Sequence, residues 1–279
     1  MNDNMQTPLT GGKHERNLGV DLLRIVAMWL ICCQHIINRG GVYAATGESR
    51  LLLYPLWVLS TAGVNIYALI SGWVTVTGRF RPARVAELWL QVFVLDLVLS
   101  TAGSLYNPDW MYPAMWRRNL MPLTQKAYWY FSAYVGVYAL SPLLNRGLLA
   151  LSKRQAAAMF WLVLLLFSVG ATMGYAEQGD PFAVVSGFSV LWLLVLYVAG
   201  ACLRLSRLTE KSPWWVLLLG AVLCVVLLTH FHDLFYRRDA AQFWKNQRGQ
   251  LLKYTNPFMT GLAGGSWRTG PPGRLRARS

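Results

Sequence analysis

The fold is decided by Asn17–Ile37, NLGVDLLRIVAMWLICCQHII, the first long apolar stretch of the chain. At about 1.5 Å of rise per residue, a helix of this length crosses the hydrocarbon core of a bilayer. Four polar residues lie within it: Asp21, Arg24, Gln34 and His35. Charged side chains at bilayer depth are costly unless they face a bundle interior or a water-filled cavity. We therefore expect this helix to line the interior of a membrane helix bundle.

The spacing of these residues places them on one side of the helix. Arg24 and His35 are eleven positions apart, so at about 100° per residue they return to within roughly 20° of each other. Asp21 precedes Arg24 by three positions, where opposite charges can pair. The pattern predicts a polar stripe with an ion pair near one membrane face and an imidazole toward the other. The alternative is an interhelical salt bridge with a packing histidine, but intramembrane charges favour function.

Bulk composition indicates an integral membrane protein. The chain has 279 residues, 55% hydrophobic and 14% charged, whereas soluble domains are about 25% charged. Its mean hydropathy is +0.35. The net charge of +14 lies largely in short loops between apolar spans, which indicates positive-inside topology and contact with anionic lipid, not nucleic acid. No pair of its four cysteines has metal-ligand spacing, so we predict no metal.

The chain reads as an all-α polytopic bundle with a cytoplasmic N-terminus. Seven spans are predicted, at about 17–38, 52–77, 85–105, 128–145, 155–176, 186–204 and 213–231. Arginines and lysines gather in alternate loops, which places the N-terminus in the cytoplasm. Tyr254–Ala263 is too short to span and reads as the start of an eighth helix.

Three segments lie outside the predicted spans. Residues 1–16 form a polar cytoplasmic tail before a membrane domain over 17–263. Residues 264–279 are basic and read as a disordered or non-native tail, so we expect the chain to stop short of its natural end. Residues 106–127 are aromatic and interrupted by proline; they form either a loop dipping toward a central cavity or an interfacial loop.

A cluster of basic residues follows the second predicted span. In Gly78–Arg84, GRFRPAR, three guanidinium groups lie within six residues, and such groups bind phosphates through bidentate hydrogen bonds. The alternative is a plain topology determinant. Next to a charged helix that opens to the same face, an anionic cytoplasmic ligand is the better interpretation. For Glu87 we favour an ion pair with Arg84 slightly over a catalytic role.

Several motifs, taken together and in order, resemble the acyltransferase 3 family of multispanning membrane enzymes. They are Arg24 and His35 with ten residues between them, Ile70-Ser71-Gly72-Trp73, Arg81-Pro82-Ala83-Arg84, and Tyr128-Trp129-Tyr130-Phe131 followed by Tyr138 to Pro142. The resemblance runs from Arg16 to about Ala263. Family members typically have about ten spans, whereas this chain offers seven and a fragment.

The resemblance implies transfer of an acyl group, usually acetyl, from cytoplasmic acyl-CoA to a hydroxyl of a cell-surface polysaccharide or lipid-linked sugar. Acyl-CoA (acetyl-CoA) is then the donor, and the acceptor is a glycan.

The chemistry of the residues agrees with this implication. We expect Arg79, Arg81 and Arg84 to bind the phosphates of acyl-CoA. His35 is the candidate general base. Arg24 binds the donor, stabilises the oxyanion or only orients the stripe through Asp21; we favour donor binding.

The expected location is the bacterial plasma membrane, as a multi-pass protein in the lipid bilayer. Two other functions remain open. One is a transporter or flippase for an anionic or glycan substrate, whose charges would line a path. The other is an inactive truncated paralogue.

Overall fold

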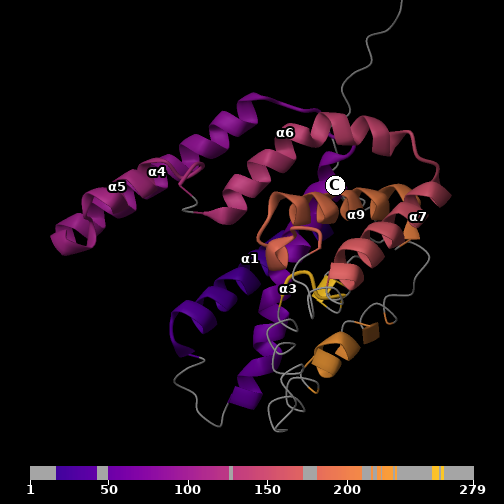
Figure 1. Cartoon of the computed structure of the whole chain (residues 1–279), viewed down its shortest axis with the longest axis horizontal. Helices are drawn as coiled ribbons and strands as arrows, with labels where there is room; N and C mark the ends of the chain where they lie inside the picture. The colour runs from indigo at the N-terminus through magenta and orange to yellow at the C-terminus, as the bar shows by residue number, and fades with distance from the viewer. Residues whose placement is uncertain are drawn as a thin grey trace, which may run out of the picture.

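The computed structural model describes residues 17–42, 50–125, 128–171 and 181–208, with 215, 219–220, 222–228, 230, 253–257 and 259–260 beyond them. These residues form helices joined by turns, without strands, so the predicted all-α fold is confirmed for the part described (Figure 1). The long helices are α1 (Leu18–Arg39), α3 (Arg50–Thr75), α4 (Ala83–Tyr106), α6 (Trp129–Leu149), α7 (Lys153–Leu164) and α9 (Val190–Ser206). Shorter helices are η2 (Pro108–Trp110), α5 (Pro113–Leu120), the π-helix η3 (Leu165–Gly170) and η4 (Val185–Gly187).

Membrane-spanning length is reached by several of these helices. Four stretches are long and apolar enough to cross a bilayer: Leu18–Arg39, Leu53–Thr75, Ala83–Tyr106 and Lys153–Gly170. Two further predicted spans coincide with α6 and with the shorter apolar helix α9. The predicted seventh span lies mostly outside the described residues, as do both tails. The count of seven spans and the cytoplasmic N-terminus therefore stay predictions.

Helix α1 begins where its sequence provides a cap. The side-chain oxygen of Asn17 accepts hydrogen bonds from the backbone N–H groups of Gly19 (3.1 Å) and Val20 (3.3 Å), which satisfies donors that the first turn leaves free. The helix then packs closely on α3, because a Cβ atom at Gly63 would lie only 2.9 Å from the carbonyl oxygen of Ala27. One side of α1 is thereby fixed against α3.

The centre of the bundle is the crossing of α3 and α9. A Cβ atom at Gly72 would overlap the carbonyl oxygen of Tyr197, and one at Gly200 would overlap that of Leu69. The two backbones are therefore in direct contact, which only glycine permits at these positions. Figure 1 shows α9 lying across α3. About two thirds of the membrane-length part of α3 is buried, so α3 is the helix on which the others assemble.

Helix α4 is more exposed and carries α5 along its side (Figure 1). Its buried residues are Asp96 and Ser100. Asp96 accepts a 2.6 Å hydrogen bond from the hydroxyl of Tyr128, and the Asn119 side chain donates to Ser100 Oγ at 2.9 Å. Within residues 106–127, α5 packs against α4, and the two arrangements expected for this segment, a loop dipping toward a cavity and an interfacial loop, stay predictions.

Residues 254–256, 259 and 260 are buried and belong to the core. Ser168, within the π-helical turn of η3, donates to the carbonyl oxygen of Thr255 at 2.6 Å. The fully buried side chain of Asn65 donates to the carbonyl oxygen of Tyr254 at 2.8 Å. Residues read from the sequence as the start of an eighth helix thus connect α3 with η3.

Candidate active site

The polar side of α1 contains the predicted ion pair. Arg24 Nη1 lies 3.1 Å from Asp21 Oδ1, with side-chain exposures of 40% and 27%. A pair of this exposure contributes little to stability. Its effect is to hold the guanidinium in place, nearly two turns after the start of the helix.

His35 lies on the same sector of the helix but does not touch Arg24. Because α1 is continuous over Leu18–Arg39, the two residues point within roughly 20° of each other and are separated by about 16 Å of rise. His35 is exposed, and the described residues give it no hydrogen bond or ion pair. The structure thus brings Asp21 and Arg24 together and leaves the imidazole open for a ligand.

The loop that carries the predicted donor-binding arginines is fastened to α6. The hydroxyl of Tyr138 accepts from the backbone N–H of Arg81 at 3.2 Å and donates to its carbonyl oxygen at 3.3 Å. The ring of Phe80 packs on that of Tyr138, with centroids 5.1 Å apart. One tyrosine therefore fixes the backbone of Arg81, while the side chain of Arg81 is 70% exposed to solvent.

Tyr138 is in turn held by the Ser-Pro step in its own helix. Pro142 has no N–H to donate to the carbonyl oxygen of Tyr138, four residues earlier. The hydroxyl of Ser141 donates to that oxygen instead, at 2.7 Å. Side-chain compensation of this kind is needed where water cannot reach.

The C-terminal end of α3, which leads into the arginine loop, is capped by side chains from two other helices. Asn145 of α6 donates to the carbonyl oxygen of Thr75 at 3.0 Å, and Arg204 of α9 donates to that of Trp73 at 2.7 Å. Tyr197 donates to Asn145 Oδ1 at 2.8 Å, which orients its amide. The loop thus starts from a fixed point.

Glu87 pairs with both motif arginines. Its carboxylate lies 3.1 Å from Arg84 and 3.5 Å from Arg81. The predicted ion pair with Arg84 is confirmed. Arg79 is exposed and joins no ion pair within the part of the chain described. Since these side chains are all well exposed, an incoming phosphate can compete with Glu87 for them.

Tyr134 connects the two arginine motifs. Arg24, from α1, and Arg84, from the start of α4, lie within electrostatic range of its side chain. Tyr134 lies on α6, four residues before Tyr138, which holds Arg81. Arginines from two motifs far apart in the sequence are therefore within electrostatic range of the same helix, α6.

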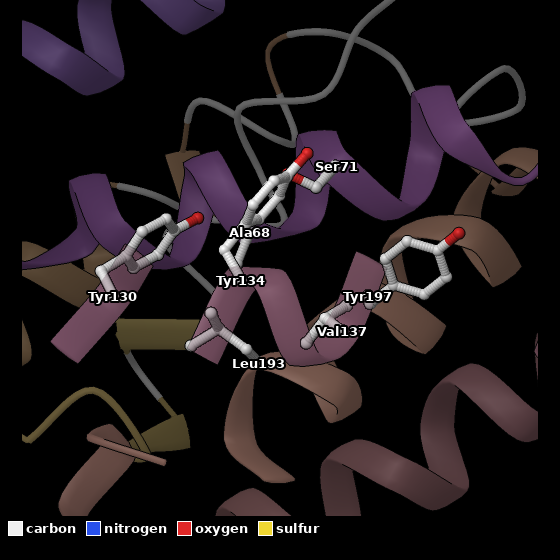
Figure 2. A pocket seen from close by; sticks show the side chains of 7 residues that line it. All are labelled: Ala68, Ser71, Tyr130, Tyr134, Val137, Leu193 and Tyr197. Atoms are coloured by element: carbon white, nitrogen blue, oxygen red, sulfur yellow. The ribbon is translucent and has the colours of Figure 1, made fainter. Parts of the chain in front are cut away.

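Three tyrosines form a row along α6 beside a narrow cavity. The rings of Tyr130, Tyr134 and Tyr138 stack at centroid distances of 6.4 and 6.3 Å. The cavity, about 160 Å³ including its open part, is lined by Ala68, Ser71, Tyr130, Tyr134, Val137, Leu193 and Tyr197. Figure 2 shows the phenol rings of Tyr130 and Tyr134 rising from α6 toward α3. Most of this volume is open to solvent, and the enclosed part has room for about one water molecule.

The hydroxyl of Tyr130 is buried without a hydrogen-bond partner of normal geometry among the described residues. The Ser71 hydroxyl is close enough to influence it electrostatically. Buried hydroxyls usually have a hydrogen-bond partner. The hydroxyl of Tyr130 can therefore donate a hydrogen bond to a group that enters this cavity.

A second polar cluster lies around Tyr254. Its hydroxyl accepts a 3.3 Å hydrogen bond from the side chain of Gln34, the residue before His35. Asn65, which holds the backbone of Tyr254, also accepts a 3.2 Å hydrogen bond from the indole N–H of Trp192. This cluster ties the end of α1 that carries His35 to α3 and α9.

The comparison with known proteins now identifies the chain. A family model described as the acyltransferase domain, of the acyltransferase 3 family, matches residues 17–264. The chain belongs to the acyltransferase 3 family. Membership makes it an acyltransferase, and with its long apolar helices an integral membrane protein. No curated protein and no solved structure matches it significantly.

Some site residues of this acyltransferase were not predicted from the sequence. The spacing of Tyr130, Tyr134 and Tyr138, four residues apart, was a readable signal for a row on one helix face. Asn65 was readable as a polar residue within an apolar span. No sequence pattern could have indicated a role for Tyr254, because its contact with Gln34 joins residues 220 positions apart.

The arginine loop should loosen when its anchor on α6 is removed. In Tyr138→Phe, both backbone hydrogen bonds of Arg81 are lost. At about 0.5–1.4 kcal/mol net, we expect amide exchange over residues 78–84 to accelerate two- to tenfold in hydrogen–deuterium exchange. Tyr112→Phe, at an exposed tyrosine, is the matched control. Equal exchange in both variants would mean that Tyr138 does not hold the loop.

Proposed function

We propose that this acyltransferase transfers an acyl group, acetyl in particular, from cytoplasmic acyl-CoA to a hydroxyl of a cell-surface polysaccharide or lipid-linked sugar. The observation that carries the proposal is the anchored and exposed arginine loop. Tyr138 holds the backbone of Arg81 through two hydrogen bonds, and the guanidinium groups of Arg81 and Arg84 remain well exposed beside the start of α4. The family match over residues 17–264 supports an acyl donor as the ligand of this loop. The location proposed is the bacterial plasma membrane, with the arginine loop in the cytoplasm.

The donor site forms at the start of α4. Arg81 and Arg84, with Arg79 nearby in the loop, offer charge-assisted and bidentate hydrogen bonds to the phosphates of acyl-CoA. The N-terminal turn of α4 begins immediately after Pro82, and the positive end of the helix dipole favours the same anion. Displacement of Glu87 from the two arginines accompanies binding.

From the loop, the thioester end of the donor follows the tyrosine row of α6. The cavity beside Tyr130 and Tyr134 has room for about one water molecule, so the side chains that line it must move apart when the arm and acyl group enter. Arg24 lies beside this route and binds the arm or the thioester. Asp21 keeps the Arg24 guanidinium oriented through their 3.1 Å contact.

The reaction occurs at His35. Its imidazole takes the proton of the acceptor hydroxyl as that oxygen attacks the thioester carbonyl, since an alcohol is a poor nucleophile until a base assists. The C–S bond breaks as the ester C–O bond is completed, and the imidazolium returns its proton to the departing thiolate. Histidine suits both transfers because its pKa is ordinarily near neutral pH.

Loss of the base should abolish transfer without loss of protein. In His35→Ala, we expect ester-linked acyl groups on envelope glycans to fall at least 100-fold in cells, as for removal of a general base. Because His35 is exposed, membrane abundance should stay unchanged. Asn38→Ala, at an exposed residue of the same helix, is the control. Full acylation with His35→Ala would refute the catalytic role.

Neutralising the arginine loop should weaken donor binding. For Arg81→Gln with Arg84→Gln, we expect acetyl-CoA affinity, measured calorimetrically on purified protein, to fall at least tenfold, since hydrogen bonds to charged groups contribute about 1.5–3 kcal/mol. The affinity of the double variant for acetyl-CoA should also fall less steeply than that of the wild type as the salt concentration rises. Arg117→Gln with Arg118→Gln, on α5, is the matched control. Unchanged affinity in the first pair would assign those arginines to topology alone.

A further inference from the structure

Three aromatic rings from distant segments gather beside the polar cluster of Gln34 and Tyr254. They are Trp129 at the start of α6, Phe188 just before α9, and Tyr254. The ring of Phe188 lies 4.8 Å from Trp129 and 5.0 Å from Tyr254, centroid to centroid. Trp129 and Tyr254 stack at 6.0 Å with 29° between their planes. We refer to these three residues as the aromatic platform.

The loop before Phe188 is strained. Ala183, Val185 and Ser186 have φ values of 50°, 50° and 58°, a region that side chains disfavour and that is an outlier for a β-branched residue such as Val185. Each such residue costs on the order of 1–3 kcal/mol, and such strain clusters at functional sites. The surrounding structure must therefore impose this conformation.

Two contacts impose it. The hydroxyl of Ser189 donates to the carbonyl oxygen of Val184 at 3.0 Å. Gly187, with φ of 97°, packs so tightly on Tyr254 that a Cβ atom there would overlap that side chain. The result is that Phe188 is held 49% exposed above the buried ring of Tyr254. A strained loop that keeps the apolar ring of Phe188 exposed indicates that this ring binds a ligand.

An interfacial aromatic belt does not account for this arrangement. Belts use tryptophan and tyrosine, whose polar groups meet the headgroups while their rings meet lipid. Phe188 has no polar group and contacts other rings, and Tyr254 is buried and uses its hydroxyl to bind Gln34. The aromatic platform is therefore a defined cluster of packed rings, with the side-chain amide of Gln34 at its edge.

We propose that the aromatic platform binds a pyranose ring of the acceptor glycan. The inference rests on the proposed function and adds to it the site of the second substrate. A pyranose presents C–H groups of partial positive charge on one face and hydroxyls around its rim. Aromatic faces carry the complementary negative charge. The Gln34 amide, with one hydrogen bond to Tyr254, keeps donor and acceptor capacity for a rim hydroxyl.

The placement suits transfer. Gln34 immediately precedes His35 on α1, so a sugar on the platform lies at the end of the helix that carries the base. The platform also adjoins Tyr130, whose ring meets that of Trp129 at 5.6 Å. The tyrosine row therefore leads the donor to the place where the acceptor is held.

The test measures sugar binding directly, separately from donor binding. Purified full-length protein in a detergent without sugar groups is mixed with the methyl β-pyranosides of glucose, galactose, mannose and N-acetylglucosamine, and saturation-transfer difference NMR reports which sugar protons contact protein. For the wild type we expect the strongest transfer to C–H protons of one ring face of at least one pyranoside. Phe188→Leu, which keeps an apolar side chain without an aromatic face, should weaken that binding about fivefold or more.

Two further variants separate stacking from packing. Phe188→Trp should retain binding because it restores an aromatic face, and Trp161→Leu, at an exposed tryptophan of α7, should bind as the wild type does. Acetyl-CoA affinity should be the same in all of them. Equal pyranoside binding by Phe188→Leu and the wild type would overturn the platform, as would no binding by the wild type.

Failure of the proposed function gives a different result. If the wild type binds a pyranoside through Phe188 but neither binds acetyl-CoA nor acylates glycans, the platform stands and the acyltransfer proposal falls. If acetyl-CoA binding and glycan acylation persist while Phe188→Leu binds and acylates as the wild type does, the platform falls alone.

Discussion

The cost of removing a charged or hydrogen-bonding group from water governs this structure. In an apolar bundle each such group must find a partner or face a wet interior. Asp21 forms an ion pair with Arg24. Ser141 makes the hydrogen bond that Pro142 cannot make, and Asn145 caps the end of α3. These contacts do more than satisfy polar groups, because each fixes a residue on the proposed path of the donor.

Close helix packing makes those contacts possible. Gly72 and Gly200 let the backbones of α3 and α9 touch, which brings Arg204 within reach of the carbonyl oxygen of Trp73. Tyrosines on α6 then lie between this crossing and the arginine loop. The packed helices thus present an exposed pair of arginines at one end and an exposed histidine toward the other. Catalysis by positioning requires such a scaffold.

The sequence predicted what depends on neighbours along the chain. Apolar length located α1, α3 and α4 within a few residues, and helical periodicity placed Arg24 and His35 on one sector. The pairs Asp21–Arg24 and Arg84–Glu87 followed from a spacing of three. Contacts across the fold were not predictable, because they depend on how helices pack. The anchoring of Arg81 by Tyr138 is of this kind, as is the strained loop before Phe188, whose residues ordinarily avoid positive φ.

The central claim is that the sector of α1 with Arg24 and His35 faces a wet interior that receives the donor. Cysteine accessibility tests it most directly. In a background without the native cysteines, His35→Cys and Ile36→Cys, both at exposed positions, are treated with a membrane-impermeant thiol reagent, with and without acetyl-CoA. The account predicts that position 35 reacts, is protected by acetyl-CoA and reacts far faster than position 36. Equal inertness of both positions, as expected for side chains in lipid, would contradict it.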